Sequence, residues 1–440
     1  MNSPLDTAYN RLDETHRAWH GALSGYHRIE DFRSNINMGI QALRNLTFAL
    51  QKQKDKFLDF ENWYATWVAK MAHDNILREL SSARTTVVHQ QDLKLYSIGT
   101  AKIKGWVDFE KVVFHFDPMK DSYSVAKSLY TKNIKNSSNP SGFRQGLVFE
   151  FERKWVYEKL PDHELLEALS YAYHFFFEML LDASKRFMLN TKESYITGNF
   201  CSCELNSKNR MKCMAITSNE RCLKYSFDSG STLKLVKVSE SKFFPSKTDL
   251  EMLEDVQVYN FKSKEIAHLL SDLIPDEYPF DLMKLSTERA INIFRMNKSL
   301  TPTFHLFFPN EKKVLALSDP STSNDQQYRH LFIDTVADEV IKNNIDFVIS
   351  VGIVGIYEVL DNKPIVVSLE NNKNSENMIQ VTYMSAQKGK IVLIPFRKNY
   401  LGKIIFSKPS VTDFGIDNDI ESMYYYMFNP IIDALRKVAE

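Results

Sequence analysis

Two differently patterned parts of the chain meet at Leu80-Ser-Ser-Ala-Arg84-Thr85-Thr86-Val87-Val88-His89-Gln-Gln-Asp92-Leu93. Glycine and proline are nearly absent from residues 26 to 98, so little interrupts helix formation before and within this stretch. From about residue 97 onward, aromatic and β-branched runs predict strands. We therefore predict an α+β protein with an N-terminal helical bundle, a β-rich middle region and a mixed α/β C-terminal domain.

The predicted bundle has four members. Residues 8–27 fit an irregular amphipathic helix, and residues 57–67 form a short aromatic segment. A clearer helix follows Asp31, because apolar residues recur there at the spacing of one helical face: Phe32, Ile36, Ile40, Leu43, Leu46 and Leu50. A further helix opens at Asp74 and runs into the stretch quoted above. Such helices bury their apolar faces against one another.

Composition shifts divide the 440 residues into three predicted domains, 1–96, 97–247 and 248–440. In the middle domain we expect strands at 106–116 and 146–152, and a long helix that starts at Pro161 and Asp162. Residues 184–247 carry twelve Lys or Arg against five Asp or Glu, a balance of +7, and the sign reverses after residue 248. In the last domain we predict strands at 303–308, 314–317, 347–351, 364–369, 379–383 and 391–395, and helices at 325–341 and 421–438.

The bulk composition narrows the class of protein. Apolar residues make up 44% and charged residues 25% of the chain, which are ordinary values for a folded soluble protein. The formal net charge is zero, so any nucleic-acid binding must come from a local patch. No apolar run approaches the ~18 residues that span a bilayer, and the first residues lack the pattern of a secretory signal. We expect a cytoplasmic protein without a membrane partner.

The four cysteines all fall in one segment, Cys201-x-Cys203-x9-Cys213-x8-Cys222. Four thiolates can enclose a tetrahedral Zn²⁺, which would be structural because four protein ligands leave no open position. The spacing differs from that of paired Cys-x2-Cys knuckles, so reduced thiols on a β-rich insert are the other interpretation. The basic residues around the cysteines either contact an RNA backbone or form a solvated face.

His174 and Glu178 are one helical turn apart on the long helix expected after Pro161. Their spacing permits two metal ligands, but on so aromatic a face a buried hydrogen-bonded pair is the expectation. The C-terminal third contains no P-loop, nucleophile elbow or His-Glu-x-x-His sequence, so its residues indicate no particular chemistry.

Arg84 and His89 are the candidate catalytic pair. Cleavage of RNA through its own 2′-hydroxyl needs a base, an acid and a cation beside the phosphorane, and it needs no metal. Histidine titrates near neutrality and arginine offers a planar fork of donors to phosphate. On a straight helix the two side chains would lie ~140° apart. The same spacing recurs at Arg11-x4-His16.

The run from Phe32 to Lys52, with Trp63-Tyr64 and the stretch from Ala83 to Leu93, resembles the HEPN-type proteins of bacteria. The resemblance covers about residues 8–96. It implies a helical bundle that pairs into a homodimer and acts as a metal-independent ribonuclease of toxin, abortive-infection or CRISPR-associated systems.

The resemblance also implies roles for individual residues. Arg84 would stabilise phosphate charge and His89 would transfer protons, while Arg44, Asn45 and Thr85 would contact the RNA. Thr85 departs from the family pattern, in which Asn is the commonest residue at that position. No cofactor is required for this cleavage, and structural zinc at the cysteines is a separate prediction.

From the sequence we thus expect a dimeric RNA endonuclease of antiviral defence, leaving 2′,3′-cyclic phosphate and 5′-hydroxyl ends. Its C-terminal domain would bind a protein or nucleotide effector that restrains the activity. One alternative is a non-catalytic scaffold or binding protein whose degenerate bundle only dimerises. Another is a zinc-braced nucleic-acid-binding protein that uses the basic patch at 184–247.

Overall fold

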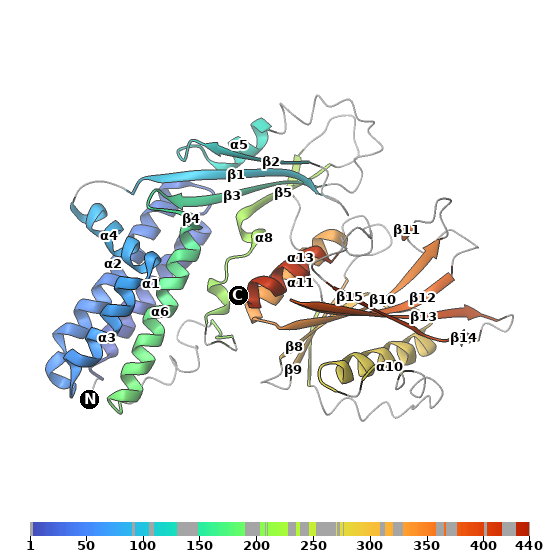
Figure 1. Ribbon diagram of the computed structural model, residues 1–440. Coiled ribbons are helices and arrows are strands. Elements are labelled where there is room, and N and C mark those ends of the chain that lie inside the picture. Colours follow the sequence, from blue (N-terminus) through green and yellow to red (C-terminus); the bar gives the residue numbers. More distant parts are fainter. Residues whose placement is uncertain are drawn as a thin grey trace. The chain divides into compact units, whose positions relative to one another are not determined.

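The chain forms two compact units, each with its own hydrophobic core (Figure 1). Unit 1 comprises Met1–Lys104 and Asp108–Val238, and unit 2 comprises Gly105–Val107 and Ser239–Glu440. The structure is a computed structural model that describes residues 3–89, 93–104, 110–129, 148–189, 203–206, 208, 210–227, 235–237, 246–251, 270, 273–275, 277–308, 313–319, 329–357, 365–366, 376–399, 403–415 and 428–439. An N-terminal helical region and antiparallel sheets make this a mixed α+β protein, as predicted.

Long helices pack side by side in unit 1: α1 (Asp6–Ser24), α2 (Ile29–Lys52), α3 (Phe60–His73), α4 (Asn75–His89) and α6 (Leu165–Arg186). A 3-10 turn, η1 (Lys54–Lys56), connects α2 to the aromatic segment. The first four helices are those expected from the glycine-poor N-terminal sequence. One cluster of buried side chains runs through all five helices, and the indole of Trp19 donates to the carbonyl of Leu166 at 3.0 Å.

The expected start of α6 at Pro161 and Asp162 is wrong. Residues before the helix form a short strand, β4 (Leu160–Glu164), which pairs with β3. The helix begins only at Leu165, because the carboxylate of Glu164 accepts the backbone N–H of Glu167 at 2.8 Å and caps the first turn.

The sheet of unit 1 is antiparallel, with the strand order β2-β1-β3-β5-β6. Its strands are β1 (Leu95–Lys104), β2 (Glu110–Phe116), β3 (Val148–Tyr157), β5 (Cys222–Phe227) and β6 (Leu235–Lys237). Helix α5 (Ser122–Leu129) covers one face, where it packs on Phe149 and Phe151. Strand β1 was not predicted. Of the strand expected at 106–116, the part from Glu110 to Phe116 forms β2, and residues 106–109 lie outside the described residues.

The two faces of this sheet differ in polarity. On the face of α5, the buried guanidinium of Arg153 donates to the carbonyls of Pro118 and Lys120 and stacks 3.5 Å from the ring centre of Trp155. On the opposite face, Glu150 lies between Lys102 and Lys224 in cross-strand register. Unit 1 therefore contains buried charges on both faces of its sheet, and their partners come from neighbouring strands for Glu150 and from the segment between β2 and α5 for Arg153.

Unit 2 is built on one antiparallel sheet with the order β14-β13-β12-β10-β8-β9-β7, to which β11 and β15 are attached. Its strands are β7 (Ser246–Glu251), β8 (Thr303–Phe308), β9 (Lys313–Ser318), β10 (Phe347–Tyr357), β11 (Ile365–Val366), β12 (Glu376–Ser385), β13 (Lys388–Lys398), β14 (Ile404–Phe406) and β15 (Ser410–Gly415). Strand β8 matches the prediction residue for residue.

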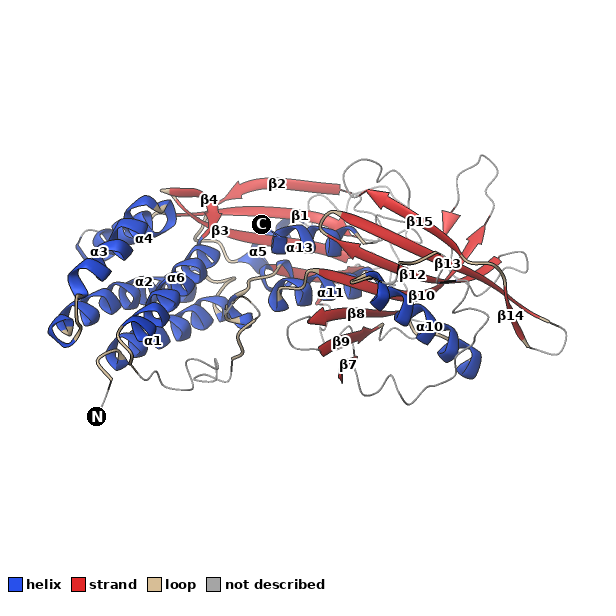
Figure 2. Ribbon diagram, turned by 60° about the horizontal axis from the view of Figure 1, so that its bottom comes forward, coloured by secondary structure: helices blue, strands red, loops and turns tan. Residues whose placement is uncertain are grey.

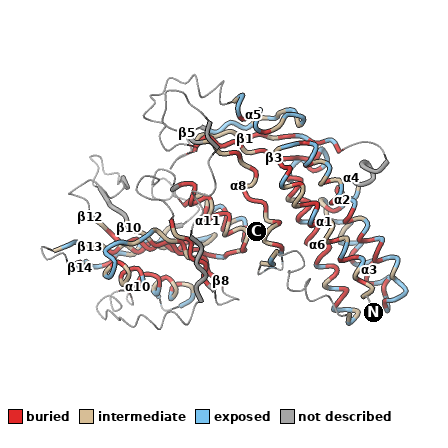
Figure 3. Tube along the Cα trace, turned by 180° about the vertical axis from the view of Figure 1, so that it is seen from behind, coloured by how far each residue is buried: buried red, intermediate tan, exposed pale blue. Residues whose placement is uncertain are grey.

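Helices cover both faces of the sheet of unit 2 (Figure 2). Helix α10 (Phe280–Asn297) packs against one face, and α11 (Arg329–Asn343) and α13 (Asn429–Ala439) pack against the other. Alternate residues of β10 serve the two cores, so Val348 faces α11 and α13 whereas Ile349 faces α10. The central strands of this sheet are accordingly buried at residues 347–351 of β10 and 378–384 of β12 (Figure 3). Among the helices that the structure describes, none has both the length and the apolar character needed to cross a membrane.

Candidate metal centre

Helix α1 presents two histidines one turn apart. His16 and His20 are separated by four residues, which turn a helix by ~400° and so place both side chains on the same face. His16 is buried and His20 is half-buried. Both rings stand in an aromatic setting: His16 lies 5.7 Å from Tyr173, and His20 lies 5.4 Å from Trp19, both centre to centre.

Two cysteines flank a tight hairpin that follows α6 in the chain. Leu205 and Met211 form a β-bridge, the amide of Asn206 donates to the carbonyl of Arg210 at 2.7 Å, and the amide of Lys212 donates to the carbonyl of Glu204 at 2.9 Å. In this register Glu204 is opposite Lys212, and Cys203 is opposite Cys213. Hairpin pairing thus brings together two thiols that are ten residues apart in sequence.

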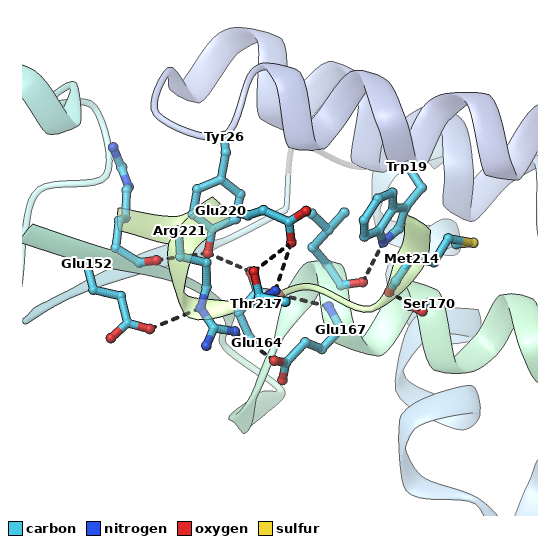
Figure 4. Close-up of polar contacts among 12 residues, drawn as sticks. Trp19, Tyr26, Glu152, Glu164, Glu167, Ser170, Met214, Thr217, Glu220 and Arg221 are labelled. Atoms are coloured by element: carbon cyan, nitrogen blue, oxygen red, sulfur yellow. Dashed lines mark hydrogen bonds and ion pairs between the residues drawn. The ribbon is translucent and has the colours of Figure 1, made fainter. Parts of the chain in front are cut away.

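The hairpin is fixed to α6 by buried hydrogen bonds. His174 Nε2 accepts the backbone N–H of Met211 at 2.9 Å, and the hydroxyl of Ser170 donates to the carbonyl of Met214 at 2.9 Å (Figure 4). The side chains of Met211 and Met214 enter the core of the bundle. His174 is therefore the buried, hydrogen-bonded residue expected, but its partner is the backbone of the hairpin, and Glu178, one turn further along α6, is exposed.

Four ligand atoms converge where α1 meets the hairpin. Nε2 of His16 lies 3.1 Å from Sγ of Cys213 and 3.2 Å from Nε2 of His20, which is 3.8 Å from Sγ of Cys203. All four atoms lie within 4.8 Å of one another. Tetrahedral Zn²⁺ with bonds of ~2.0 Å to nitrogen and ~2.3 Å to sulfur requires ligand atoms to stand roughly 3.3–3.8 Å apart. The three distances given above are close to this range, and the other pairs, which lie within 4.8 Å, would draw closer around a bound ion.

The protonation of the histidines suits a metal ligand. Desolvation, reinforced by the neighbouring His20, lowers the pKa of His16 to about 4, and desolvation also lowers the pKa of His20. Both imidazoles are therefore neutral at pH 7 and can offer a nitrogen lone pair. Two neutral imidazoles and two thiolates would leave a bound Zn²⁺ site with no net charge, which favours its burial.

The predicted four-cysteine set is divided in the structure. Cys203 and Cys213 belong to the cluster, Cys201 lies outside the described residues, and Cys222 lies on β5 opposite Glu152. Desolvation, with Glu150 and Glu152, raises the pKa of the Cys222 thiol well above its ordinary value, which disfavours a thiolate there. The other two candidate ligands could have been found from the pair His16-x3-His20, whose spacing places two histidines on one helical face. The sequence analysis did not consider this pair.

The residues assigned to RNA cleavage come from other elements than those that form this cluster. Arg84, Thr85 and His89 lie on α4, and their side chains are outside what the structure describes. Asn45 is exposed on α2, and the guanidinium of Arg44 lies 4.6 Å from the ring centre of Phe48.

The chain matches a protein-family model over residues 1–397, and the family is described as bacteriophage lambda protein ea47. Protein ea47 of Escherichia phage lambda is 29% identical over 150 residues, which are 34% of this chain and 36% of that protein. This alignment thus spans about a third of the length of the relative. No solved structure matches the chain.

These comparisons overturn the HEPN interpretation. A single family covers the supposed HEPN segment and three hundred residues beyond it, and that family is not a HEPN family. The predicted RNA endonuclease, the role in antiviral defence and the alternative of a degenerate HEPN scaffold are therefore wrong. The HEPN resemblance was the reason to expect RNA and a second copy of the chain as partners, and it no longer supports either expectation. By its match over residues 1–397, the chain belongs to the family of bacteriophage lambda protein ea47.

Proposed function

We propose that this chain is a zinc-binding protein in which one Zn²⁺, held by His16, His20, Cys203 and Cys213, braces unit 1. The convergence of four ligand atoms from two distant segments carries the proposal. Two imidazoles and two thiolates form a donor set that suits zinc better than the hard cations Mg²⁺ and Ca²⁺, which prefer oxygen. Four protein ligands leave no open position for substrate, so the ion is structural.

The metal would anchor one end of a strap, the segment from Cys203 to Arg221, that crosses unit 1. At the other end, the guanidinium of Arg221 on α8 (Ser218–Arg221) lies 3.0 Å from Glu152 of β3 and 2.7 Å from Glu167 of α6 (Figure 4). Between these ends, Glu220 accepts the amide of Thr217 at 2.8 Å. Zinc would thus join α1 to a segment that already links α6 with the sheet.

The strap needs such an anchor because it contains little regular structure. Its described elements are the hairpin bridge, a single 3-10 turn, η5 (Lys212–Met214), and the short helix α8. Segments of this kind gain folding free energy directly from metal binding.

Metal analysis of the purified full chain tests the proposal. We expect one zinc per chain, lost in Cys213→Ser and in His20→Gln and retained in the control Cys222→Ser. Co²⁺ substitution should produce the visible d–d and thiolate charge-transfer bands of a tetrahedral site with sulfur ligands. These bands should disappear with Cys203→Ser and survive Cys222→Ser.

Equal zinc content in Cys213→Ser, His20→Gln and the parent chain would refute the site. Loss of zinc in Cys222→Ser but not in His20→Gln would instead place the metal on a cysteine-only set.

A further inference from the structure

A second site of unit 1 lies in the helical bundle, away from the metal cluster. A cavity of about 380 Å³ opens between α2, α3 and α4, and α6 forms its floor. Leu43, Leu80, Ala172 and Phe176, all buried, provide apolar wall and floor. The volume lies within the ~300–1,000 Å³ range of small-molecule sites, which are typically apolar with a few placed polar groups.

Polar groups gather on the α2 side of this cavity. Arg44 is half-buried there, and its described contacts are the hydroxyl of Thr47 at 3.5 Å and the ring of Phe48 at 4.6 Å. Within the described part of the chain, no carboxylate forms an ion pair with Arg44. A guanidinium placed beside an apolar cavity without an acidic partner is complementary to an anion.

Tyr64 adds a neutral donor next to this charge. Its buried hydroxyl accepts from the amide nitrogen of Gln51 at 3.1 Å, and both residues line the cavity. Desolvation raises the pKa of Tyr64, opposed by its contacts with Gln51 and Arg44, so the hydroxyl keeps its proton at pH 7. The phenol can therefore donate to the same anion that Arg44 binds.

Among the described residues that line the cavity, the other arginine is Arg78, which already has partners. Arg78 donates to Glu79 at 3.2 Å and to Asn75 at 2.5 Å, so its positive charge is shared with an acid of its own helix. One uncompensated cation matches a monoanion, whereas a phosphate dianion would call for further cationic partners.

We propose that this cavity binds a small amphipathic carboxylate, whose apolar body enters the space between Leu43 and Phe176 and whose carboxylate pairs with Arg44 and Tyr64. The site is independent of the zinc, because none of its lining residues belongs to the metal cluster. It assigns a ligand function to the helical part of the chain.

Octanoate is a suitable probe, because it combines a short aliphatic body with one carboxylate. Titration of the full chain by calorimetry or NMR should show saturable binding of octanoate and at least roughly tenfold weaker binding of octanol, which lacks the charge. Arg44→Gln should weaken octanoate roughly 10- to 100-fold and leave octanol unchanged, because a charge-assisted hydrogen bond is worth ~1.5–3 kcal/mol. The matched control Lys52→Gln removes an exposed charge of the same helix and should bind octanoate like the parent.

A second variant tests the cavity without touching the core. Ser81 is exposed on α4 at the cavity mouth, and Ser81→Trp should obstruct entry and reduce binding of both probes while the melting temperature stays near that of the parent. Three outcomes overturn the proposal: no saturable octanoate binding at millimolar concentration, equal affinities for octanoate and octanol, or unchanged octanoate affinity in Arg44→Gln.

Discussion

The two units of this chain are stabilised by different kinds of interaction. Unit 2 buries apolar side chains on both faces of its sheet, with α10 on one and α11 and α13 on the other. Unit 1 also has a large core and adds a polar strap and the metal cluster, and both units bury charged side chains, among them Glu150 in unit 1 and Asp334 in unit 2. Apolar burial is insensitive to pH and metal, whereas paired charges and metal ligands respond to both. We therefore expect removal of a metal to act mainly on unit 1.

Removal of zinc should give the largest contrast between the units. If free metal stands at ~1,000 times its dissociation constant, binding stabilises the folded state by ~4 kcal/mol. A zinc chelator should then increase amide hydrogen exchange in α1 and in the strap, measured by mass spectrometry, and leave the peptides of β8, β10 and β12 unchanged. An equal increase in amide hydrogen exchange in both units would contradict the expectation that zinc stabilises only unit 1.

Loss of the carboxylate at Glu150 should come next in size. Desolvation raises its pKa, but Lys224, Lys102 and Lys104 outweigh this and lower the pKa to about 2. Its stabilising effect is therefore present above the unfolded pKa of ~4.3 and is lost as the pH falls toward 2. At pH 7, Glu150→Gln should cost ~3 kcal/mol in urea unfolding of unit 1, because the buried Lys104 and the partly buried Lys102 and Lys224 lose this carboxylate.

An exposed ion pair provides the control for Glu150. Glu61 lies 3.1 Å from Lys54, and both side chains are more than half exposed. Glu61→Gln should change stability by less than ~1 kcal/mol. Comparable losses in the two variants would show that burial of the Glu150 charge has no particular importance.

Glu164→Gln should have a smaller effect on stability than Glu150→Gln, and the effect should have the opposite sign. Desolvation and the neighbouring Glu167 raise its pKa to about 7. The folded state thus binds the proton more tightly than the unfolded state, so stability falls as the pH rises from ~4.3 to ~7. Glu164→Gln keeps an acceptor for the Glu167 amide without the charge and should stabilise unit 1 by ~1–2 kcal/mol at pH 8. The gain in stability over the parent should vanish at pH 4. An equal gain at pH 4 and pH 8 would contradict the raised pKa of Glu164.

Local pattern predicted much of the fold. The 3.6-residue period marked α2, and the bounded apolar run at 303–308 marked β8. Strand β1 could not be predicted from its own residues, because Gly99 is unfavourable in a strand unless the neighbouring strand is known. A Cβ on Gly99 would lie 2.7 Å from the ring of Phe114, so the packing of β2 on β1 explains the glycine. The start of α6 was misplaced because the cap is Glu164, a residue without strong N-cap preference.

Two of the four candidate metal ligands, Cys203 and Cys213, could be predicted from the sequence. The cysteine segment drew attention to Cys203 and Cys213, but the search for further ligands stayed within that segment. His16 entered sequence reasoning only as part of Arg11-x4-His16, which indicated how often an Arg and a His share that spacing by chance. Sequence spacing could not join α1 to the hairpin, because the contact depends on the packing of both against α6. The HEPN interpretation failed for a related reason, since apolar helical spacing is common to unrelated bundles.

The order of folding follows from the separation of the metal ligands. His20 and Cys203 are 183 residues apart, and His16 and Cys213 are 197 apart. Closing a loop of that length in an unfolded chain costs roughly 5 kcal/mol of entropy, so the four ligands cannot assemble early. The sheet of unit 1 and α6 must first bring α1 and the hairpin together. During synthesis the histidines emerge long before the cysteines, and we expect zinc to be captured last, as the step that completes unit 1.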